Sequence, residues 1–207
     1  MNNEAIKQGA ARAVPVSTLS TYVAAPAAPA YATASATAAA PALAAIPGDD
    51  LAPDGAITAI LPIYDDNGRG IVIYTADGGR RVTGRRMRSI LQHLAERNCR
   101  TIPLIRRRMK DLLGGRQELP LPISPQLLLV PCKVITPRVK GDETIGYFSL
   151  AHIRALHTLP HRSHGHAAEL PVYELSDGRR VALLCTSDTA RHRLEMAAYA
   201  RCLMFGA

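Results

Sequence analysis

The sequence predicts an α+β fold: a mostly antiparallel β-sheet with a few amphipathic helices, preceded by a disordered Ala/Pro-rich arm. Three observations support this prediction. Two runs of β-forming residues are interrupted by Asp-Gly turns, each run is followed by a segment with helical periodicity, and residues 24–47 are almost wholly Ala, Pro, Thr and Ser. Hairpins with tight turns and separate helices are typical of this class.

The N-terminal arm covers residues 1–53 in this interpretation. Its segment "AAPAAPAYATASATAAAPALAAIP" offers few large side chains whose burial would offset the entropy of ordering the backbone. Pro and Thr interrupt every apolar run, so we expect neither a secretory signal nor a membrane span of about 20 residues. Residues 54–207 are then the folded domain, at a length that allows a sizeable core.

The first hairpin is expected in "GIVIYTADGGRRVTG", with its turn at Asp77 and Gly78. The following segment "RRMRSILQHLAER" has the spacing of an amphipathic helix. Its expected buried face consists of Met87, Ile90, Leu91 and Leu94.

The middle of the domain reads mainly as strand. "QLLLVPCKVIT" predicts a buried strand bent at Pro131, "PRVKGDET" a turn that carries Arg138 and Lys140, and "IGYFSL" the returning strand. The segment "SLAHIRALH" then predicts one or two helical turns capped by Ser149.

The last part of the chain repeats the first plan. "YELSDGRRV" is nearly a copy of "YTADGGRRV", so "PVYELSDGRRVALLCT" predicts a second hairpin with a helix after it. Thr186, Ser187 or Asp188 is expected to cap this helix. The sequence therefore predicts two ββα units, and the residues expected to face inward from the closing helix are Leu194, Ala198 and Cys202 or Leu203.

Basic residues are concentrated in one part of the chain. The formal net charge is +8, yet the segment from Arg80 to Arg116 alone holds twelve bases against Glu96 and Asp111. Eleven of the twelve are Arg, whose planar guanidinium suits phosphate oxygens, guanine edges and narrow minor grooves. Focused positive charge captures polyanions, so the pattern favours nucleic-acid binding over the alternative of a solvated basic helix.

We expect a DNA-binding surface centred on residues 106–110, on a loop or a helix. Arg100 and Arg116 flank this centre as phosphate clamps, and the exposed turn at Arg138 and Lys140 touches the adjacent backbone. The sequence leaves open which Arg contacts bases. The predicted contact residues are Arg100, Arg106, Arg107, Arg108, Lys110, Arg116, Arg138 and Lys140.

Signals for catalysis are weaker. His161, His164 and His166 have a spacing that suits a transition metal, which gives a metal-dependent hydrolase as the alternative function. Pro160 and Gly165 favour a polar surface loop instead. The chain also has no P-loop, no GxGxxG after a strand and no GxSxG elbow. We therefore expect a protein that is not an enzyme and needs no cofactor.

Two further features bear on class and compartment. The aromatic share is 4%, which counts against a further alternative, a generic RNA-binding module that stacks single-stranded bases. The four cysteines are far apart, without CxxC spacing, and fit reduced thiols in a cytoplasmic protein.

Taken in order, these motifs resemble the ComK family of bacterial competence transcription factors. The resemblance rests on "RNCR" ahead of the basic segment, Pro122, Ile123 and Pro125 before "LLLVP", the stretch "GYFSLAHI", and the ending "YELSDGRRVALLCTSDTARHRLEMAAYAR". It covers roughly residues 60–203, whereas the arm and the His-rich segment lie outside the pattern.

The resemblance implies a cytoplasmic, nucleoid-associated activator that binds double-stranded DNA at A/T-rich boxes. It also implies dimers or higher oligomers on DNA, and control by an adaptor that delivers the protein to a protease. LytTR-type DNA-binding domains, a second family with a mainly β scaffold and helices, support the same class of activity.

Overall fold

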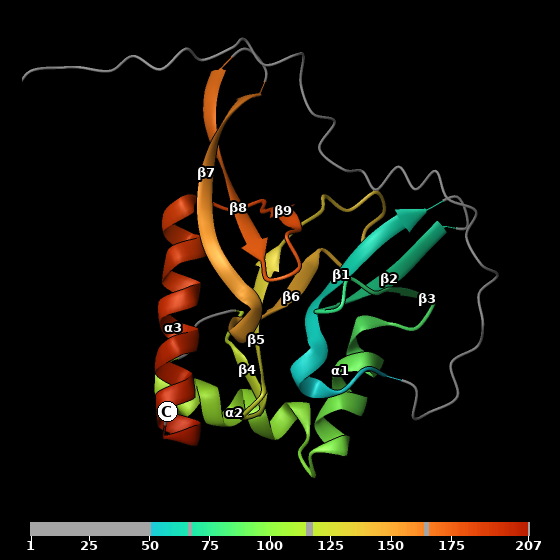
Figure 1. The fold of residues 1–207 in the computed structure, drawn as a ribbon, viewed down its shortest axis with the longest axis vertical. Coiled ribbons are helices and arrows are strands. Elements are labelled where there is room, and N and C mark those ends of the chain that lie inside the picture. The colour runs from blue at the N-terminus through green and yellow to red at the C-terminus, as the bar shows by residue number, and fades with distance from the viewer. Residues whose placement is uncertain (1–50, 66–67, 115–117, 164–165, 207) are drawn as a thin grey trace, which may run out of the picture. The chain divides into compact units, whose positions relative to one another are not determined.

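The computed structural model describes residues 51–65, 68–114, 118–163 and 166–206. Within these residues the chain forms nine strands in two antiparallel sheets and three α-helices, shown in Figure 1. The predicted α+β class is therefore confirmed.

The larger sheet has six strands in the order β3-β2-β1-β6-β5-β4, and every neighbouring pair is antiparallel. The strand that joins its two halves is β1, which pairs with β2 on one side and with β6 on the other. The bounds are β1 (Ile57–Asp65), β2 (Gly68–Thr75), β3 (Arg80–Thr83), β4 (Leu121–Ser124), β5 (Leu127–Lys133) and β6 (Ile145–Ser149).

The smaller sheet has the order β7-β8-β9 and is dominated by a long hairpin. A single 3-10 turn precedes the first strand of each sheet. The bounds are η1 (Asp54–Ala56) before β1, η2 (Leu150–His152) before β7, and then β7 (Ile153–Ser163), β8 (His166–Leu175) and β9 (Arg180–Ala182).

The helices are α1 (Met87–Arg97), α2 (Ile102–Leu113) and α3 (Ser187–Phe205). On α1 the predicted apolar face is confirmed, because all four expected residues are buried. The predicted start of α3 is also confirmed, since the Thr186 side chain accepts a hydrogen bond from the Thr189 amide at 3.2 Å and so caps the helix.

The two sheets and α3 meet at Tyr173 of β8, which is fully buried. Its ring makes an edge-to-face contact with Phe148 of β6, with centroids 5.2 Å apart. Its hydroxyl donates to the Ala190 carbonyl of α3 at 3.0 Å and lies 3.5 Å from the Cys132 thiol of β5. One side chain thus connects both sheets to the closing helix.

The predicted pair of ββα units is confirmed, and each unit includes one more strand. β1-β2-β3-α1 and β7-β8-β9-α3 follow the same order, each after its 3-10 turn. Both first strands shift register at the same place, between Ile57 and Ala59 and between Ile153 and Ala155.

The two hairpin turns also use the same hydrogen bonds. Asp77 accepts from the Gly79 amide and Asp177 from the Arg179 amide, both at 3.0 Å. The turns touch each other, because the Arg179 guanidinium donates to the Gly78 carbonyl at 2.7 Å and lies 4.1 Å above the Tyr74 ring. Gly78 has φ +85°, a left-handed conformation in which an added side chain is strained.

The prediction of helical turns in "SLAHIRALH" was wrong beyond its first residues. Only Leu150–His152 forms a 3-10 turn, without a side-chain cap from Ser149, and the chain then enters β7. The long ladder with β8 supplies backbone partners over ten residues, which outweighs a weak local helical signal. Part of the expected His-rich loop is strand for the same reason, since His161 lies on β7 and His166 on β8.

The expected inner face of α3 was also largely wrong. Leu194 is partly buried against the core, but Ala198 and Cys202 are exposed and Leu203 is 44% exposed. The helix instead packs through alanines, whose small side chains let it approach both sheets closely. These buried alanines are Ala190, Ala197 and Ala200.

The Tyr173 contacts predict a specific loss of stability. Tyr173→Phe removes the only polar atom of this side chain and leaves its buried partners without that bond, so the free energy of unfolding should fall by about 1 to 2 kcal/mol. Tyr199→Phe on the outer face of α3, where the side chain is 55% exposed, should change it by less than about 0.5 kcal/mol. Urea unfolding measures both; equal effects would contradict the role of Tyr173.

Candidate nucleic-acid interface

The central basic segment forms α2. Pro103 stands in the first turn, where a missing amide hydrogen costs nothing, and Gly114 with φ +82° follows the last residue. The helix is anchored by three buried residues, Ile102, Ile105 and Met109, spaced so that they lie on one face.

The anchored face determines where the basic side chains of α2 point. At 3.6 residues per turn, Arg107 lies about half a turn from the buried face, so it points to solvent. Arg106 and Lys110 lie one turn apart on one flank, and Arg108 lies on the other flank. All four side chains are exposed, and the structure brings them together on one helix.

These four bases have no carboxylate partner in the part of the chain that the structure describes. The acid of this helix, Asp111, is exposed. Arginines elsewhere do pair with acids. The pairs include Arg69–Asp142, Arg97–Asp54, Arg179–Asp177, Arg180–Glu174 and Arg193–Glu118.

Arg100 does not join this exposed cluster. It is partly buried, donates to the Pro122 carbonyl at 3.0 Å and places its guanidinium 5.3 Å from the Phe205 ring centroid. These contacts connect the entry of α2 to β4 and to the end of α3, so Arg100 is held in packing. Arg116, the other expected clamp, lies outside the described residues.

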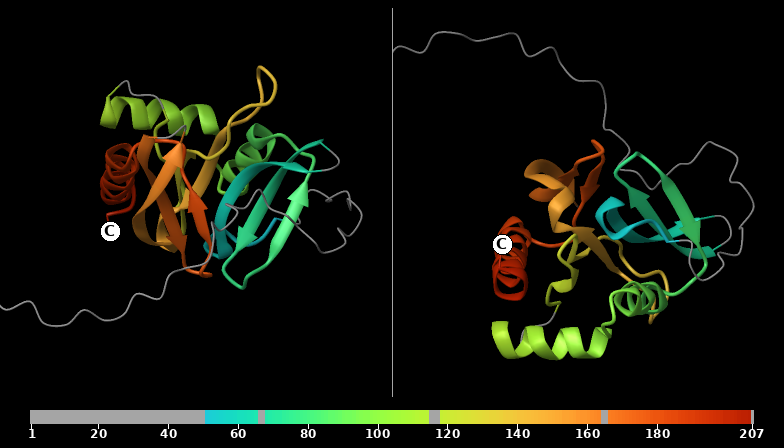
Figure 2. Two further views of the ribbon diagram at one scale, coloured as in Figure 1. Left: turned by 90° about the horizontal axis from the view of Figure 1, so that it is seen from above. Right: turned by 60° about the horizontal axis from the view of Figure 1, so that its bottom comes forward.

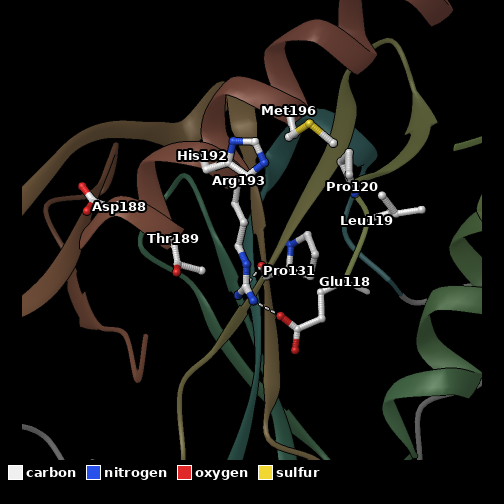
Figure 3. Close-up of a pocket in the computed structure, with 9 residues that line it drawn as sticks. All are labelled: Glu118, Leu119, Pro120, Pro131, Asp188, Thr189, His192, Arg193 and Met196. Atoms are coloured by element: carbon white, nitrogen blue, oxygen red, sulfur yellow. Dashed lines mark hydrogen bonds and ion pairs between the residues drawn. The ribbon is translucent and has the colours of Figure 1, made fainter. Parts of the chain in front are cut away.

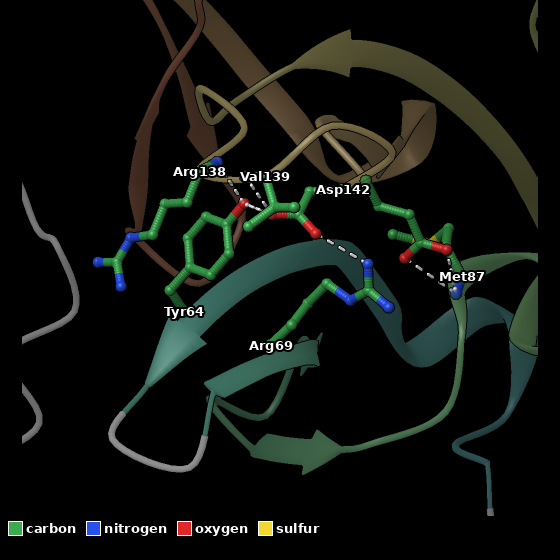
Figure 4. Close-up of polar contacts among 7 residues, drawn as sticks. Tyr64, Arg69, Met87, Arg138, Val139 and Asp142 are labelled. Carbon is green, nitrogen blue, oxygen red and sulfur yellow. Dashed lines mark hydrogen bonds and ion pairs between the residues drawn. The ribbon is translucent and has the colours of Figure 1, made fainter.

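Arg138 and Lys140 lie on the exposed loop between β5 and β6, as the sequence predicts. The Arg138 guanidinium lies 4.4 Å from the Tyr64 ring centroid, and its amide donates to the Tyr64 hydroxyl at 2.9 Å (Figure 4). The end of β1 therefore fixes the position of this basic loop.

Asp142 organises the loop, a role that the sequence did not reveal because its side-chain partners on β1 and β2 are distant in the chain. Its carboxylate accepts from the Tyr64 hydroxyl, from the Val139 amide at 3.0 Å and from Arg69 of β2 at 2.9 Å (Figure 4). The hydroxyl, the amide and the guanidinium together hold the pKa of Asp142 below its usual value of 3.8.

The next acid, Glu143, connects the loop to α1. Its two carboxylate oxygens accept from the Met87 amide at 3.1 and 3.2 Å, at the first residue of that helix. A carboxylate is favourable at a helix N-terminus, because the unpaired amides there carry partial positive charge. In both views of Figure 2 the loop, α1 and α2 lie on the same side of the six-stranded sheet.

The histidines of the alternative function fall on the β7-β8 hairpin. His161 lies on β7 and His166 on β8, but His164 and the side chains of all three lie outside the described residues. Where the structure does describe side chains, no three His, Cys, Asp or Glu are grouped so as to hold a metal ion. The metal-dependent hydrolase stays an untested alternative.

Comparison with protein-family models, curated proteins and solved structures gives no match for this chain. Among the helices of the described residues, none combines the length and the apolar character needed to cross a bilayer.

The Asp142 network predicts a measurable titration. Because the folded-state pKa is lowered, the network is intact above the usual pKa near 3.8 and is lost as the pH falls through the lower folded value. Tyr64→Phe removes a donor to the carboxylate, so the pKa of Asp142 should rise towards its usual value. Carboxyl ¹³C NMR titration measures this shift.

Tyr74→Phe is the matched control, since Tyr74 contacts Arg179 and not this loop. It should leave the Asp142 titration unchanged. A wild-type pKa of 3.8 or higher for Asp142, or no response to Tyr64→Phe, would contradict the network.

Proposed function

We propose that this chain is a sequence-specific, double-stranded-DNA-binding transcriptional activator that contacts DNA through α2. The observation that carries the proposal is the cluster of exposed bases on one side of this helix, namely Arg106, Arg107, Arg108 and Lys110, none with a carboxylate partner in the described chain. Bases that are kept at a surface without carboxylate partners are available to phosphates.

The dimensions of a helix support contact in the major groove. A helix with its side chains is about 10 to 12 Å across and the groove is about 12 Å wide. In that orientation Arg107 faces the base edges. The flanking Arg106, Lys110 and Arg108 then face the two phosphate backbones, which set register without reading sequence.

The loop between β5 and β6 adds a second contact in this proposal. This loop, which carries Arg138 and Lys140, lies on the same side of the sheet as α2 (Figure 2). Stacking on Tyr64 restricts the Arg138 side chain before DNA binds, which reduces the entropy lost on binding. We assign this loop to backbone phosphates farther along the duplex, because Figure 1 shows it near the opposite end of the sheet from α2.

The resemblance to ComK proteins extends the proposal to the target and the assembly. It favours A/T-rich boxes, a dimer or higher oligomer on DNA, and a role in competence for DNA uptake. Control by an adaptor and protease rests on the resemblance alone.

Charge removal on α2 tests the proposed contact. Arg107→Ala combined with Arg108→Ala should weaken binding to a selected duplex by about ten- to a hundredfold and reduce the salt slope of log K by about 2, because two phosphate or base contacts are lost. The melting temperature should stay nearly unchanged, since both side chains are exposed. Fluorescence anisotropy at several salt concentrations measures this.

Arg191→Ala combined with Arg201→Ala removes the same charge from the exposed face of α3 and is the matched control. It should retain most of the affinity. Equal loss from both pairs would show that net charge alone drives binding, and unfolding of the α2 variant would show that its arginines are structural.

Sequence specificity needs a separate test. Selection of bound duplexes from a random pool should enrich A/T-rich boxes. The affinity for the most enriched duplex should fall by about 10³- to 10⁵-fold between 50 and 200 mM salt if six to ten phosphates are contacted. If the selection enriches no sequence, the protein is a generic polyanion binder and the proposed sequence specificity is wrong.

A further inference from the structure

A pocket of about 410 Å³ opens beside the basic flank of α2. Volumes of roughly 300 to 1,000 Å³ are typical of small-molecule sites. Arg106 and Lys110 of α2 line one side. The other lining residues include Leu121 of β4, Pro131 of β5, and Ile145 and Tyr147 of β6. A cationic side therefore faces walls that are mostly apolar.

The charge in this pocket is positive once internal pairs are taken into account. Glu118 also lines it, but its carboxylate is paired with Arg193 of α3. Arg106 and Lys110 have no such partner among the described carboxylates. The pocket thus offers two cations to a bound anion.

Tyr147 adds a hydrogen-bond donor. Its side chain is 8% exposed, and burial raises the pKa of its phenol, with the nearby Arg106 guanidinium opposing part of that rise. The hydroxyl therefore stays protonated at neutral pH and can donate to an oxyanion held by Arg106 and Lys110.

A second cavity of about 370 Å³ adjoins the first and shares Glu118, Leu119 and Pro131 with it. It continues to α3, where Arg193 donates to the Pro131 carbonyl at 3.1 Å and reaches Glu118 (Figure 3). Because that guanidinium is occupied, this cavity adds room for apolar atoms, against Leu119 and Met196, rather than a second anion site.

We propose that the pocket binds a small amphipathic organic anion. Its acidic head lies between Arg106, Lys110 and the Tyr147 hydroxyl, and its apolar body lies against Pro131 and Ile145. If α2 contacts DNA as proposed above, the ligand and the DNA phosphates compete for the same two cations, so the ligand releases the protein from DNA. Binding of the anion itself does not depend on that function.

Anilinonaphthalene sulfonate, a fluorescent aromatic anion, is the probe. The full-length protein should bind it at a single site, and Lys110→Ala and Tyr147→Phe should each weaken binding by about tenfold, as expected for loss of one contact to a charged group. Arg107→Ala removes the same charge from the same helix outside the pocket and should leave binding unchanged. Circular dichroism verifies that each variant is folded.

Displacement of the probe defines the head group. Naphthoate and naphthyl phosphate should displace it, and their relative affinity distinguishes a carboxylate from a phosphate ligand, whereas neutral naphthamide should not. The proposal would be overturned if folded Lys110→Ala bound the probe as tightly as the wild-type protein does. It would also be overturned if naphthamide displaced the probe as effectively as naphthoate. Lys110 is exposed, so this variant stays informative if Tyr147→Phe does not fold.

Competition is measured separately, as the change in DNA affinity when naphthoate is added. Weaker DNA binding supports the shared site, and unchanged DNA binding at saturating naphthoate overturns the competition. Failure of the DNA proposal would instead appear as normal DNA affinity in the Arg107→Ala, Arg108→Ala double variant, with the probe results unaffected.

Discussion

The burial of Ile102, Ile105 and Met109 under α2 is the constraint on which the interpretation of this surface depends. A helix anchored by one apolar stripe has no rotational freedom left, so the remaining side chains are directed to solvent as a set. This anchor determines the solvent-facing direction of four bases, Arg106, Arg107, Arg108 and Lys110. Their common exposure is thus a consequence of core packing, and the charge they concentrate is a cost to folding that a polyanion would remove.

Three carboxylates elsewhere in the molecule form contacts that stabilise the fold. Asp142 orders the loop between β5 and β6, Glu143 satisfies the N-terminus of α1, and Glu118 holds Arg193 of α3. None of these three carboxylates forms an ion pair with a described base of α2. These three acids secure a loop and two helices, and the α2 bases stay outside their contacts.

The sequence predicted the elements whose signals come from adjacent residues. It did not predict the elements whose conformation depends on partners far along the chain. The turns at Asp77 and Asp177 and the cap at Thr186 were predictable, because each depends on a few adjacent residues. The strand β7 was not, since its backbone bonds come from β8. The sequence predicted that the bases at residues 106–110 are displayed together, but it left open whether a loop or a helix carries them. The role of Asp142 and the pocket at Tyr147 arise from residues far apart in sequence.

The most direct test of the central claim follows the guanidinium groups themselves. NMR of the Arg side-chain Nε–H groups, with and without an A/T-rich duplex, reports which arginines meet DNA. The account predicts that signals of Arg106, Arg107 and Arg108 shift and become protected from solvent exchange, while Arg191 on α3 is unaffected. Unchanged α2 signals, together with shifts from another face of the protein, would contradict it.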